Sequence, residues 1–396
     1  MLRRAMACLL GVLLGVLLMA AAIPARAVIS DGALEGAPMK PDCAAAMLLE
    51  PESGQIVFEI NADEKRPVAS VTKIMTILLV CEAIEDGAID LTEDVAVSKN
   101  AAGMGGSQVL LDAGETQTVN ELLKSVIVGS ANDSAVALAE HIAGSAELFV
   151  DRMNDRAAEL GMTNTNFVNC TGLPTENQYT TARDVARMAA ALSKHDLFYD
   201  YSSIWLEDFT HESGRVTTLT NTNKLLRLYD GCDGIKTGST NEAGYCMAAS
   251  AKRGGMRLIA VVLGAPSGKE RFKIAEAMLD YGFAGYRLYP VAERGAAVRG
   301  KMPVNGGSAD GVPLVLNQDL TLLVKKGEER GISLEAELPE AIDAPVRTGD
   351  VVGYVRVLRG GEMIARVPVA AAESVSARSL GNGLARVIQK WCFSAG

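Results

Sequence analysis

The sequence predicts a mixed α/β (α+β) domain, in which helices cover an antiparallel sheet, followed by a small all-β domain. Three observations support this fold class. Residues 71–84 are almost entirely apolar, which is typical of a helix buried on all sides. Residues 245–251 and 257–263 are apolar segments around an Arg-Gly-Gly turn, the pattern of an antiparallel hairpin. After residue 287 the pattern changes to short alternating strands.

The length and the N-terminus predict two exported domains. With 396 residues and 48% apolar content, the chain is larger than one comfortable core. Arg3 and Arg4 precede an apolar run over residues 5–23, and Ala25-Arg26-Ala27 is a small-residue cleavage pattern. We expect residues 1–27 to be a secretory signal peptide, with an uncleaved anchor as the alternative because the run is long. The protein is expected at the outer face of the cytoplasmic membrane or in the cell wall.

Charge and composition argue against several classes of function. Without residues 1–27 the chain has 35 basic and 48 acidic residues, a formal charge of −13. An acidic chain with few aromatic residues is a poor nucleic-acid binder. The six remaining cysteines are too few for a disulfide scaffold of this size. They match no zinc spacing, and the three histidines form no His-x-x-x-His pair, so we expect no metal and no cofactor.

The elements of the first domain follow from turn and capping residues. Residues 44–61 read as a hairpin around the turn Pro51–Gly54. Pro67 and Ser70 suit the start of the apolar helix, and Gly87 suits its end. A Thr-Val-Asn-Glu capping box at 118–121 announces the next helix. Further helices are expected at 134–143, 146–160, 182–193 and 269–281, with a long polar loop at 163–181 that we expect to be ordered.

The C-terminal part contains predicted strands at 332–338, 354–358 and 363–369. We therefore divide the chain into a signal peptide (1–27), a first domain (28–285), a small β-rich domain (286–373) and a tail (374–396). Past Glu373 the tail has no acidic residue, and its basic residues are Arg378, Arg386 and Lys390. Its apolar residues Leu380, Leu384, Val387, Ile388 and Trp391 recur at helical spacing, so we expect an amphipathic helix on an anionic membrane surface. The alternative is that its apolar face docks on the β domain.

Ser70 and Lys73 lie three residues apart, about one helical turn. A serine hydroxyl needs an adjacent base to act as a nucleophile, and a lysine becomes such a base when burial lowers its pKa. The alternative is a capping serine and a lysine that reaches water. Two further motifs favour the first interpretation. Ser130-Ala-Asn132 and Lys236-Thr-Gly238 follow in the order found in enzymes that use such a serine as a nucleophile and become acylated on it. Ser-x-Asn also occurs at 98–100, so only the ordered set is specific.

The resemblance extends beyond these motifs. The chain resembles the low-molecular-mass D-alanyl-D-alanine carboxypeptidases, penicillin-binding proteins of serine peptidase family S11, over about residues 40–285. The stretches that carry it are Ser-Gln-Val-Leu-Leu at 107–111, Ser-Ala-Asn-Asp at 130–133, Leu-Gly-Met-x-Asn-Thr-x-Phe at 160–167, Tyr-Thr-Thr-Ala-Arg-Asp at 179–184, Asp-Gly-Ile-Lys-Thr-Gly at 233–238 and Ala-Gly-Tyr at 243–245. The resemblance implies a first domain with the fold of the serine β-lactamases and penicillin-binding transpeptidases.

The resemblance also implies the reaction, a two-step acyl transfer on peptidoglycan stem peptides ending in D-Ala-D-Ala, with β-lactams as inhibitors. Ser70 would be the nucleophile, Lys73 the base and Ser130 the proton relay to the leaving group. The N–H groups of Ser70 and Ser239 would form the oxyanion hole. The substrate would be held by Asn132 at its amide and by Lys236, Thr237 and Gly238 at its terminal carboxylate, with Arg271 as a helper.

Four questions stay open. The family often has histidine where this chain has Thr171, which leaves the substrate contacts of that loop undetermined. A serine β-lactamase shares the motifs but needs a glutamate-activated water, and the chain contains no Glu-x-x-Leu-Asn. A wall-binding or penicillin-sensing protein without turnover is the non-enzymatic alternative. Cys170 and Cys232 precede two motif segments and could lie close together, although two unrelated buried thiols are the preferred interpretation.

Overall fold

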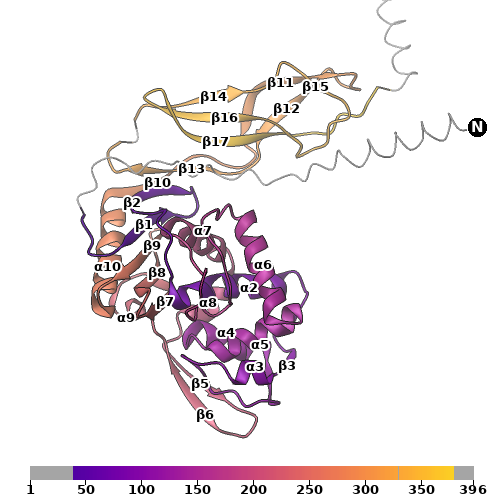
Figure 1. Cartoon of the computed structure of the whole chain (residues 1–396). Coiled ribbons are helices and arrows are strands. Elements are labelled where there is room, and N and C mark those ends of the chain that lie inside the picture. The colour runs from indigo at the N-terminus through magenta and orange to yellow at the C-terminus, as the bar shows by residue number, and fades with distance from the viewer. Residues whose placement is uncertain (1–38, 329, 379–396) are drawn as a thin grey trace, which may run out of the picture. The chain divides into compact units, whose positions relative to one another are not determined.

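The computed structural model describes residues 39–328 and 330–378, and the predicted signal peptide lies outside them. The described chain forms two compact units (Figure 1). The first contains residues up to 288 together with 323–327, and the second contains residues 289–322 and those from 328 onward.

The first unit is built on a five-stranded antiparallel sheet with the order β2-β1-β9-β8-β7. Its strands are β1 (Ala45–Glu50), β2 (Gln55–Ile60), β7 (Cys232–Thr240), β8 (Gly244–Arg253) and β9 (Met256–Ala265). Both predicted hairpins are confirmed, and the pairing of β1 with β9 joins them into one sheet. The sheet therefore combines segments about 200 residues apart in sequence.

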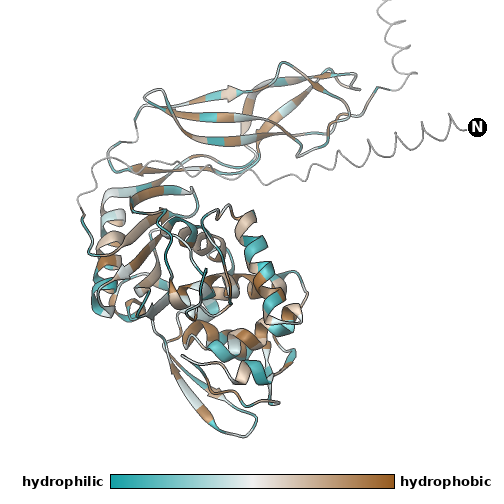
Figure 2. Cartoon of the chain, in the orientation of Figure 1, coloured by the Kyte–Doolittle hydropathy of each residue, from teal (hydrophilic) through white to brown (hydrophobic). Residues whose placement is uncertain are grey.

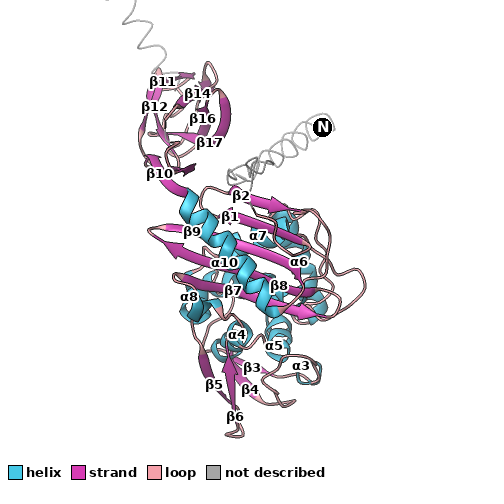
Figure 3. Cartoon of the chain, turned by 90° about the vertical axis from the view of Figure 1, so that its left-hand side faces the viewer, coloured by secondary structure: helices cyan, strands magenta, loops and turns pink. Residues whose placement is uncertain are grey.

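Each face of the sheet contributes to a different core. Ala45, Met47 and Leu49 pack with the helices on one side. Ala46 and Leu48 point the other way and pack against α10 (Gly268–Gly285), which crosses that face diagonally in Figure 3. This alternation follows from the two-residue period of a strand. A sheet covered on both sides explains why β1 and β9 are apolar at nearly every position.

The helix predicted from the apolar run at 71–84 is α2 (Lys73–Glu85), and most of its residues are buried. It contacts α4 (Val119–Val128), α5 (Asn132–Ala143), α6 (Ala146–Glu159) and α7 (Ala182–Leu192). The outer α6 is amphipathic: it buries Phe149, Met153 and Ala157 at intervals of four, and hydrophilic and hydrophobic residues alternate along it in Figure 2. The contrast confirms the prediction that the apolar run forms a buried helix.

Three predicted helix boundaries are wrong by a few residues. Ser70 does not begin an α-helix but lies in the 3₁₀ turn η1 (Ala69–Thr72), and α2 begins at Lys73. Helix α5 begins at Asn132 instead of 134, so Asn132 and Asp133 lie in its first turn. Helix α10 continues through Gly282 because that glycine packs directly against the side chains of Leu258 and Leu48, where a larger residue would clash.

The long polar loop at 163–181 is ordered, as predicted. Isolated β-bridges join Arg66 to Thr180 and Asn166 to Tyr179. Other short elements of the first unit are α3 (Lys99–Ala102), β3 (Asp94–Ala96), β4 (Thr116–Thr118), α8 (Asp196–Ser202), β5 (Leu206–Thr210), β6 (Val216–Thr220) and α9 (Leu225–Leu228). The β5–β6 hairpin was not predicted, because its strands are mostly exposed and lack a marked apolar pattern.

The second unit is the predicted all-β domain. Its six-stranded sheet has the order β14-β16-β17-β12-β11-β15. Strands β10 (Tyr286–Ala292) and β13 (Leu320–Lys325) form a separate two-stranded sheet, and each contains a point at which the chain passes from one unit to the other. The strands of the larger sheet are β11 (Ala297–Asn305), β12 (Gly311–Leu316), β14 (Ile332–Glu337), β15 (Ile342–Asp343), β16 (Val351–Arg359) and β17 (Glu362–Ala371). The three predicted strands are confirmed as β14, β16 and β17.

The predicted start of the amphipathic tail at residue 374 is wrong. Val375 and Ala377 form β-bridges with Val346 and Gly307, and Arg378 lies 3.4 Å from Asp310. Extended backbone pairing thus continues through residues 374–378, whose N–H and C=O groups find partners in the β domain. The remainder of the predicted helix, 379–396, lies outside the described residues. Within the part of the chain that is described, no helix is both long and apolar enough to cross a membrane.

Candidate active site

Ser70 lies in the turn η1, and two segments pack closely against the main chain of this turn. Each segment has a glycine at the point of contact. The residue before Ser70, Ala69, has a φ of +50°, an unfavourable conformation for a residue with a side chain. A Cβ on Gly238 of β7 would lie 2.7 Å from the Val68 carbonyl oxygen and 2.8 Å from the Ser70 nitrogen. A Cβ on Gly172 would lie 1.9 Å from the Ala69 oxygen. Only glycine at both positions lets β7 and the 163–181 loop pack against the main chain of Ser70.

Lys73 is completely buried beside Ser70. Its Nζ lies 3.1 Å from Ser70 Oγ, 2.5 Å from Asn132 Oδ1 and 2.7 Å from the Thr171 carbonyl oxygen. Burial disfavours the charged amine and lowers the pKa of Lys73 from 10.5 to about 7, although the nearby Asp133 opposes the shift. Lys73 therefore has a substantial neutral fraction at neutral pH.

The three partners of Lys73 fix the direction of its lone pair. A neutral amine has two N–H donors and one acceptor lone pair, whereas the Asn132 amide oxygen and the Thr171 carbonyl can only accept. Those two groups therefore take both N–H hydrogens. Ser70 is the one partner with a hydroxyl proton to give, so the lone pair faces Ser70 Oγ. This arrangement suits a base that removes the serine proton.

Ser130 lies in the bend between α4 and α5, and Asn132 is the first residue of α5. Ser130 is buried with a φ of +64°, and its Oγ has no hydrogen-bond partner within the described residues. A buried hydroxyl without a partner is uncommon and is available for a substrate. Asn132 donates from Nδ2 to the Gly105 carbonyl oxygen at 2.6 Å while its Oδ1 accepts from Lys73. The bend thus presents one free hydroxyl and one oriented amide.

Strand β7 brings a second buried lysine to the site. Lys236 is 1% exposed, and its Nζ donates to the Thr237 carbonyl oxygen at 3.2 Å. No carboxylate of the described chain pairs with it. Burial, and then the positive charges of Lys73 and Arg271, lower its pKa well below the usual lysine value. Because no carboxylate of the described chain pairs with Lys236, an anion that binds beside it would favour its charged form, so this end of the site is suited to an anionic group.

Arg271 of α10 lies behind the same strand. Its Nη1 donates to the main-chain oxygens of Gly238 at 3.0 Å and Cys246 at 3.2 Å, so it braces β7 and β8. Its Nε is buried without a partner in the described part of the chain. Ser239, the next residue of β7, is exposed and pairs with Tyr245 across the sheet. All the residues predicted for the site therefore lie in or beside it, with Arg271 set back.

Sequence reasoning missed the main-chain oxygen of Thr171 and the side chain of Thr222. Thr171 holds Lys73 through its carbonyl, while its hydroxyl lies 3.1 Å from Asn169 Oδ1. Thr222 lies between two buried asparagines, 221 and 223, and its Oγ1 is 2.7 Å from Thr237 Oγ1. The Asn-Thr-Asn pattern was the only available signal for Thr222. A carbonyl has no sequence signal at all.

The two cysteines that precede motif segments are both free thiols, so the hypothesised pair is not formed. The Cys170 carbonyl accepts from Thr76 Oγ1 at 2.6 Å, and burial raises the pKa of its thiol to about 12. Cys232 Sγ contacts the carbonyl oxygen of Gly234 in its own strand. The preferred interpretation, two unrelated small residues, is the one consistent with these surroundings. Among the described residues no group of three or more His, Cys, Asp or Glu side chains gathers to hold a metal.

Comparison with known families adds to this geometry. Residues 34–267 match the model of the D-alanyl-D-alanine carboxypeptidases, peptidase family S11, and residues 286–377 match the C-terminal domain of penicillin-binding protein 5. The chain belongs to the S11 D-alanyl-D-alanine carboxypeptidase family. It is 40% identical to the D-alanyl-D-alanine carboxypeptidase DacF of Bacillus subtilis over 347 residues, 87% of this chain and 89% of that protein. It is 36% identical to DacC of Escherichia coli, with 84% of each chain covered.

A solved structure of a penicillin-binding protein agrees with the fold. Penicillin-binding protein 5 from Haemophilus influenzae superposes with a TM-score of 0.76 at 33% identity, covering 86% of this chain and 99% of that one. The predicted fold class and the predicted family are therefore confirmed. As a member of this family, the protein is a serine-type D-Ala-D-Ala carboxypeptidase and a penicillin-binding protein.

Proposed function

We propose that this carboxypeptidase removes the terminal D-alanine from peptidoglycan stem pentapeptides through an acyl-enzyme on Ser70, with Lys73 as the general base. The same serine is acylated by β-lactams. The observation that supports the proposal best is the placement of Lys73 Nζ, which is fully buried and surrounded by two acceptors and the Ser70 hydroxyl.

The first step forms the acyl-enzyme. Ser70 Oγ attacks the carbonyl carbon of the penultimate D-Ala as its proton passes to the lone pair of Lys73. The bond between that carbon and the nitrogen of the terminal D-Ala then breaks. Ser130 Oγ delivers a proton to this nitrogen and is replenished from Lys73, so D-Ala leaves as a neutral amine. The unpartnered hydroxyl of Ser130 suits this relay.

The second step restores the enzyme. A water molecule attacks the ester carbon, and the bond between that carbon and Ser70 Oγ breaks. The water oxygen stays on the shortened peptide as part of a carboxylate, one water proton goes to Ser70 Oγ, and the other is released to solvent. The main-chain N–H groups of Ser70 and Ser239 stabilise the oxyanion of both steps, each contributing about 3 kcal/mol. The close approach of Gly238 to the Ser70 nitrogen supports this assignment, because it brings the end of β7 next to the nucleophile.

Substrate recognition follows from the charge of the site. Lys236 and the Thr237 hydroxyl bind the terminal carboxylate, and Arg271 adds positive charge from behind β7. A peptide that continues past this point lacks the carboxylate, which explains why the enzyme acts on a C-terminal residue. Asn132 retains one free N–H for the substrate amide when the other is bonded to Gly105.

A labelled β-lactam and a D-Ala-D-Ala pentapeptide test the proposal together. We expect a stable covalent adduct that maps to Ser70, and release of one D-Ala per pentapeptide, both lost in Ser70→Ala. Rapid hydrolysis of the β-lactam without D-Ala release would instead identify a β-lactamase. Binding of either compound without any covalent adduct would identify a protein that senses or binds the wall without turnover.

We also propose that residues 1–27 direct export and that residues 379–396 associate with the anionic membrane surface. The charge pattern of the two segments supports this, since the first combines arginines with an apolar run and the second places basic residues beside Trp391. Such a location would place the enzyme where its wall substrate is made.

A further inference from the structure

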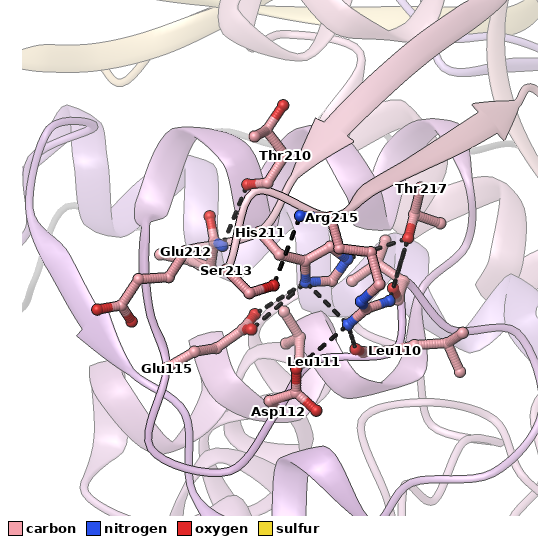
Figure 4. A network of polar contacts seen from close by, with 12 residues as sticks. Leu110, Leu111, Asp112, Glu115, Thr210, His211, Glu212, Ser213, Arg215 and Thr217 are labelled. Carbon is pink, nitrogen blue, oxygen red and sulfur yellow. Dashed lines mark hydrogen bonds and ion pairs between the residues drawn. The ribbon is translucent and has the colours of Figure 1, made fainter.

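The exposed β5–β6 hairpin holds a segment that leads to the active site. Thr217 Oγ1 donates to the Val109 carbonyl oxygen at 3.1 Å, and Arg215 Nη2 donates to the carbonyl oxygen of Leu110. Arg215 also lies 3.4 Å from the Asp112 carboxylate. These contacts join residues about 105 positions apart in sequence, and Figure 4 shows Arg215 and Thr217 reaching from the hairpin toward Leu110 and Asp112.

A buried histidine orients the hairpin side of this contact. His211 is 2% exposed, and its Nε2 lies 3.0 Å from Thr217 Oγ1. Because the Thr217 hydroxyl proton is given to the Val109 carbonyl, Thr217 Oγ1 accepts from His211 Nε2–H. On the other edge of the ring, Nδ1 lies 3.2 Å from both Glu115 Oε1 and Arg215 Nη2 (Figure 4). The imidazole therefore holds both contacting side chains of the hairpin in place.

The opposite edge of the same segment is held by Asp133 at the start of α5. The Asp133 carboxylate is 1% exposed and accepts from the N–H groups of Val109 and Leu111, each at 3.1 Å. The hairpin thus binds carbonyls of residues 109–110, and Asp133 binds N–H groups of residues 109 and 111. Leu110 between them has a φ of +67°, which a non-glycine residue keeps only where surrounding contacts enforce it.

The same segment also contacts Asn132 of the active site. We refer to residues 105–112 as the bridging segment. The Asn132 main-chain N–H donates to the Ser107 oxygen at 2.7 Å, and Asn132 Nδ2 donates to the Gly105 oxygen. A Cβ on Gly106 would lie 2.7 Å from Asn132 Nδ2, so the segment is packed tightly on the amide that holds Lys73. A displacement of the bridging segment therefore alters the position of Asn132.

We propose that the β5–β6 hairpin is a clamp that positions Asn132, and through it Lys73, by fixing the bridging segment. Arg215 and Thr217 are positioning residues for acylation, although neither contacts the reacting atoms. The proposal rests on the proposed role of Lys73 as the base of the Ser70 acyl-enzyme. It has a physical basis in the steep dependence of such reactions on geometry, since a misplacement of about 1 Å can reduce a rate about 100-fold.

Matched threonine variants test the clamp. Thr217→Val removes the hydroxyl that reaches the bridging segment, and Thr217→Ser restores it. Thr218→Val is the control, because Thr218 is exposed and its Oγ1 bonds only to Asp208 within the hairpin. Arg215→Met is a second, partly exposed site that tests the same contact if Thr217→Val folds poorly. The readouts are the acylation rate with a labelled β-lactam, kcat for D-Ala release, and Tm.

We expect Thr217→Val and Arg215→Met to lower the acylation rate about tenfold, with Thr217→Ser and Thr218→Val close to the parent. Parental acylation in both Thr217→Val and Arg215→Met would overturn the clamp, as would a loss that simply follows Tm across all four variants. Hydrogen exchange supplies a readout that does not need activity: the N–H groups of Val109 and Leu111 should exchange faster in Thr217→Val than in Thr218→Val. If the parent itself forms no adduct, the proposed function fails, and equal exchange in the two variants separately refutes the clamp.

Discussion

Replacing Lys73 with alanine tests the proposed mechanism most directly. The change removes the Lys73 amine, whose two acceptor partners leave its lone pair facing Ser70 Oγ. Because Lys73 forms no ion pair with a carboxylate of the described chain, its loss leaves no acid unpaired. We therefore expect the fold to persist and acylation by both peptide and β-lactam to disappear.

The magnitude follows from the pKa of Lys73. At pH 7 an amine with a pKa of about 7 is about half neutral, whereas an amine with the usual 10.5 is neutral in about 3 of 10,000 molecules. Burial thus increases the reactive fraction about 1,600-fold. Removing a general base typically reduces a rate about 100- to 10,000-fold. We expect Lys73→Ala to lower the acylation rate by about 1,000-fold or more.

The pH dependence gives the same test without mutation. The base acts only when deprotonated, so the parental acylation rate should fall about tenfold per pH unit below pH 7 and level off above it. Stopped-flow mixing with a labelled β-lactam between pH 5 and 9 measures this profile. Lys73→Arg should be as inactive as Lys73→Ala, because guanidinium stays protonated. A parental rate in Lys73→Ala would show that another group is the base. A parental rate that still rises about tenfold per pH unit up to pH 9 would show that the pKa of the base is not lowered by burial.

Three further predictions concern packing, stability and location. Gly238→Ala should push β7 away from Ser70 and lower acylation at least about tenfold, while Gly285→Ala, whose Cβ meets nothing within 4 Å, should keep the parental rate. Arg183→Ala removes a mostly buried guanidinium that pairs with the partly buried Glu59 and the exposed Asp63, and it should lower the free energy of unfolding in urea by about 2 kcal/mol. Lys273→Ala, from an exposed pair on α10, should lower it by less than about 1 kcal/mol. Deletion of 379–396 should move the exported protein from the membrane to the soluble fraction, and equal partitioning of both forms would exclude this segment as the anchor.

Several features of the fold and the site could be predicted from residues close together in sequence. The apolar run of α2, the capping threonine of α4 and the Arg-Gly-Gly turn between β8 and β9 are local signals, since caps, turns and helical faces depend on neighbours within about four residues. The pair Ser70 and Lys73 is of this kind as well. Its separation of three residues placed both side chains together even though Ser70 turned out to lie in a 3₁₀ turn.

The features that suit Lys73 to its proposed role as the base were decided by tertiary structure. Its full burial, its pKa of about 7 and the acceptors that orient it come from Asn132 and Thr171, which lie 59 and 98 residues away in sequence. Tertiary packing likewise brings Gly172 and Gly238 against the main chain around Ser70. It also forms the hydrogen bonds between the β5–β6 hairpin and residues 109–112. A sequence pattern specifies which groups are present, but desolvation and hydrogen-bond direction are properties of the packed interior. They appear only when the distant segments meet.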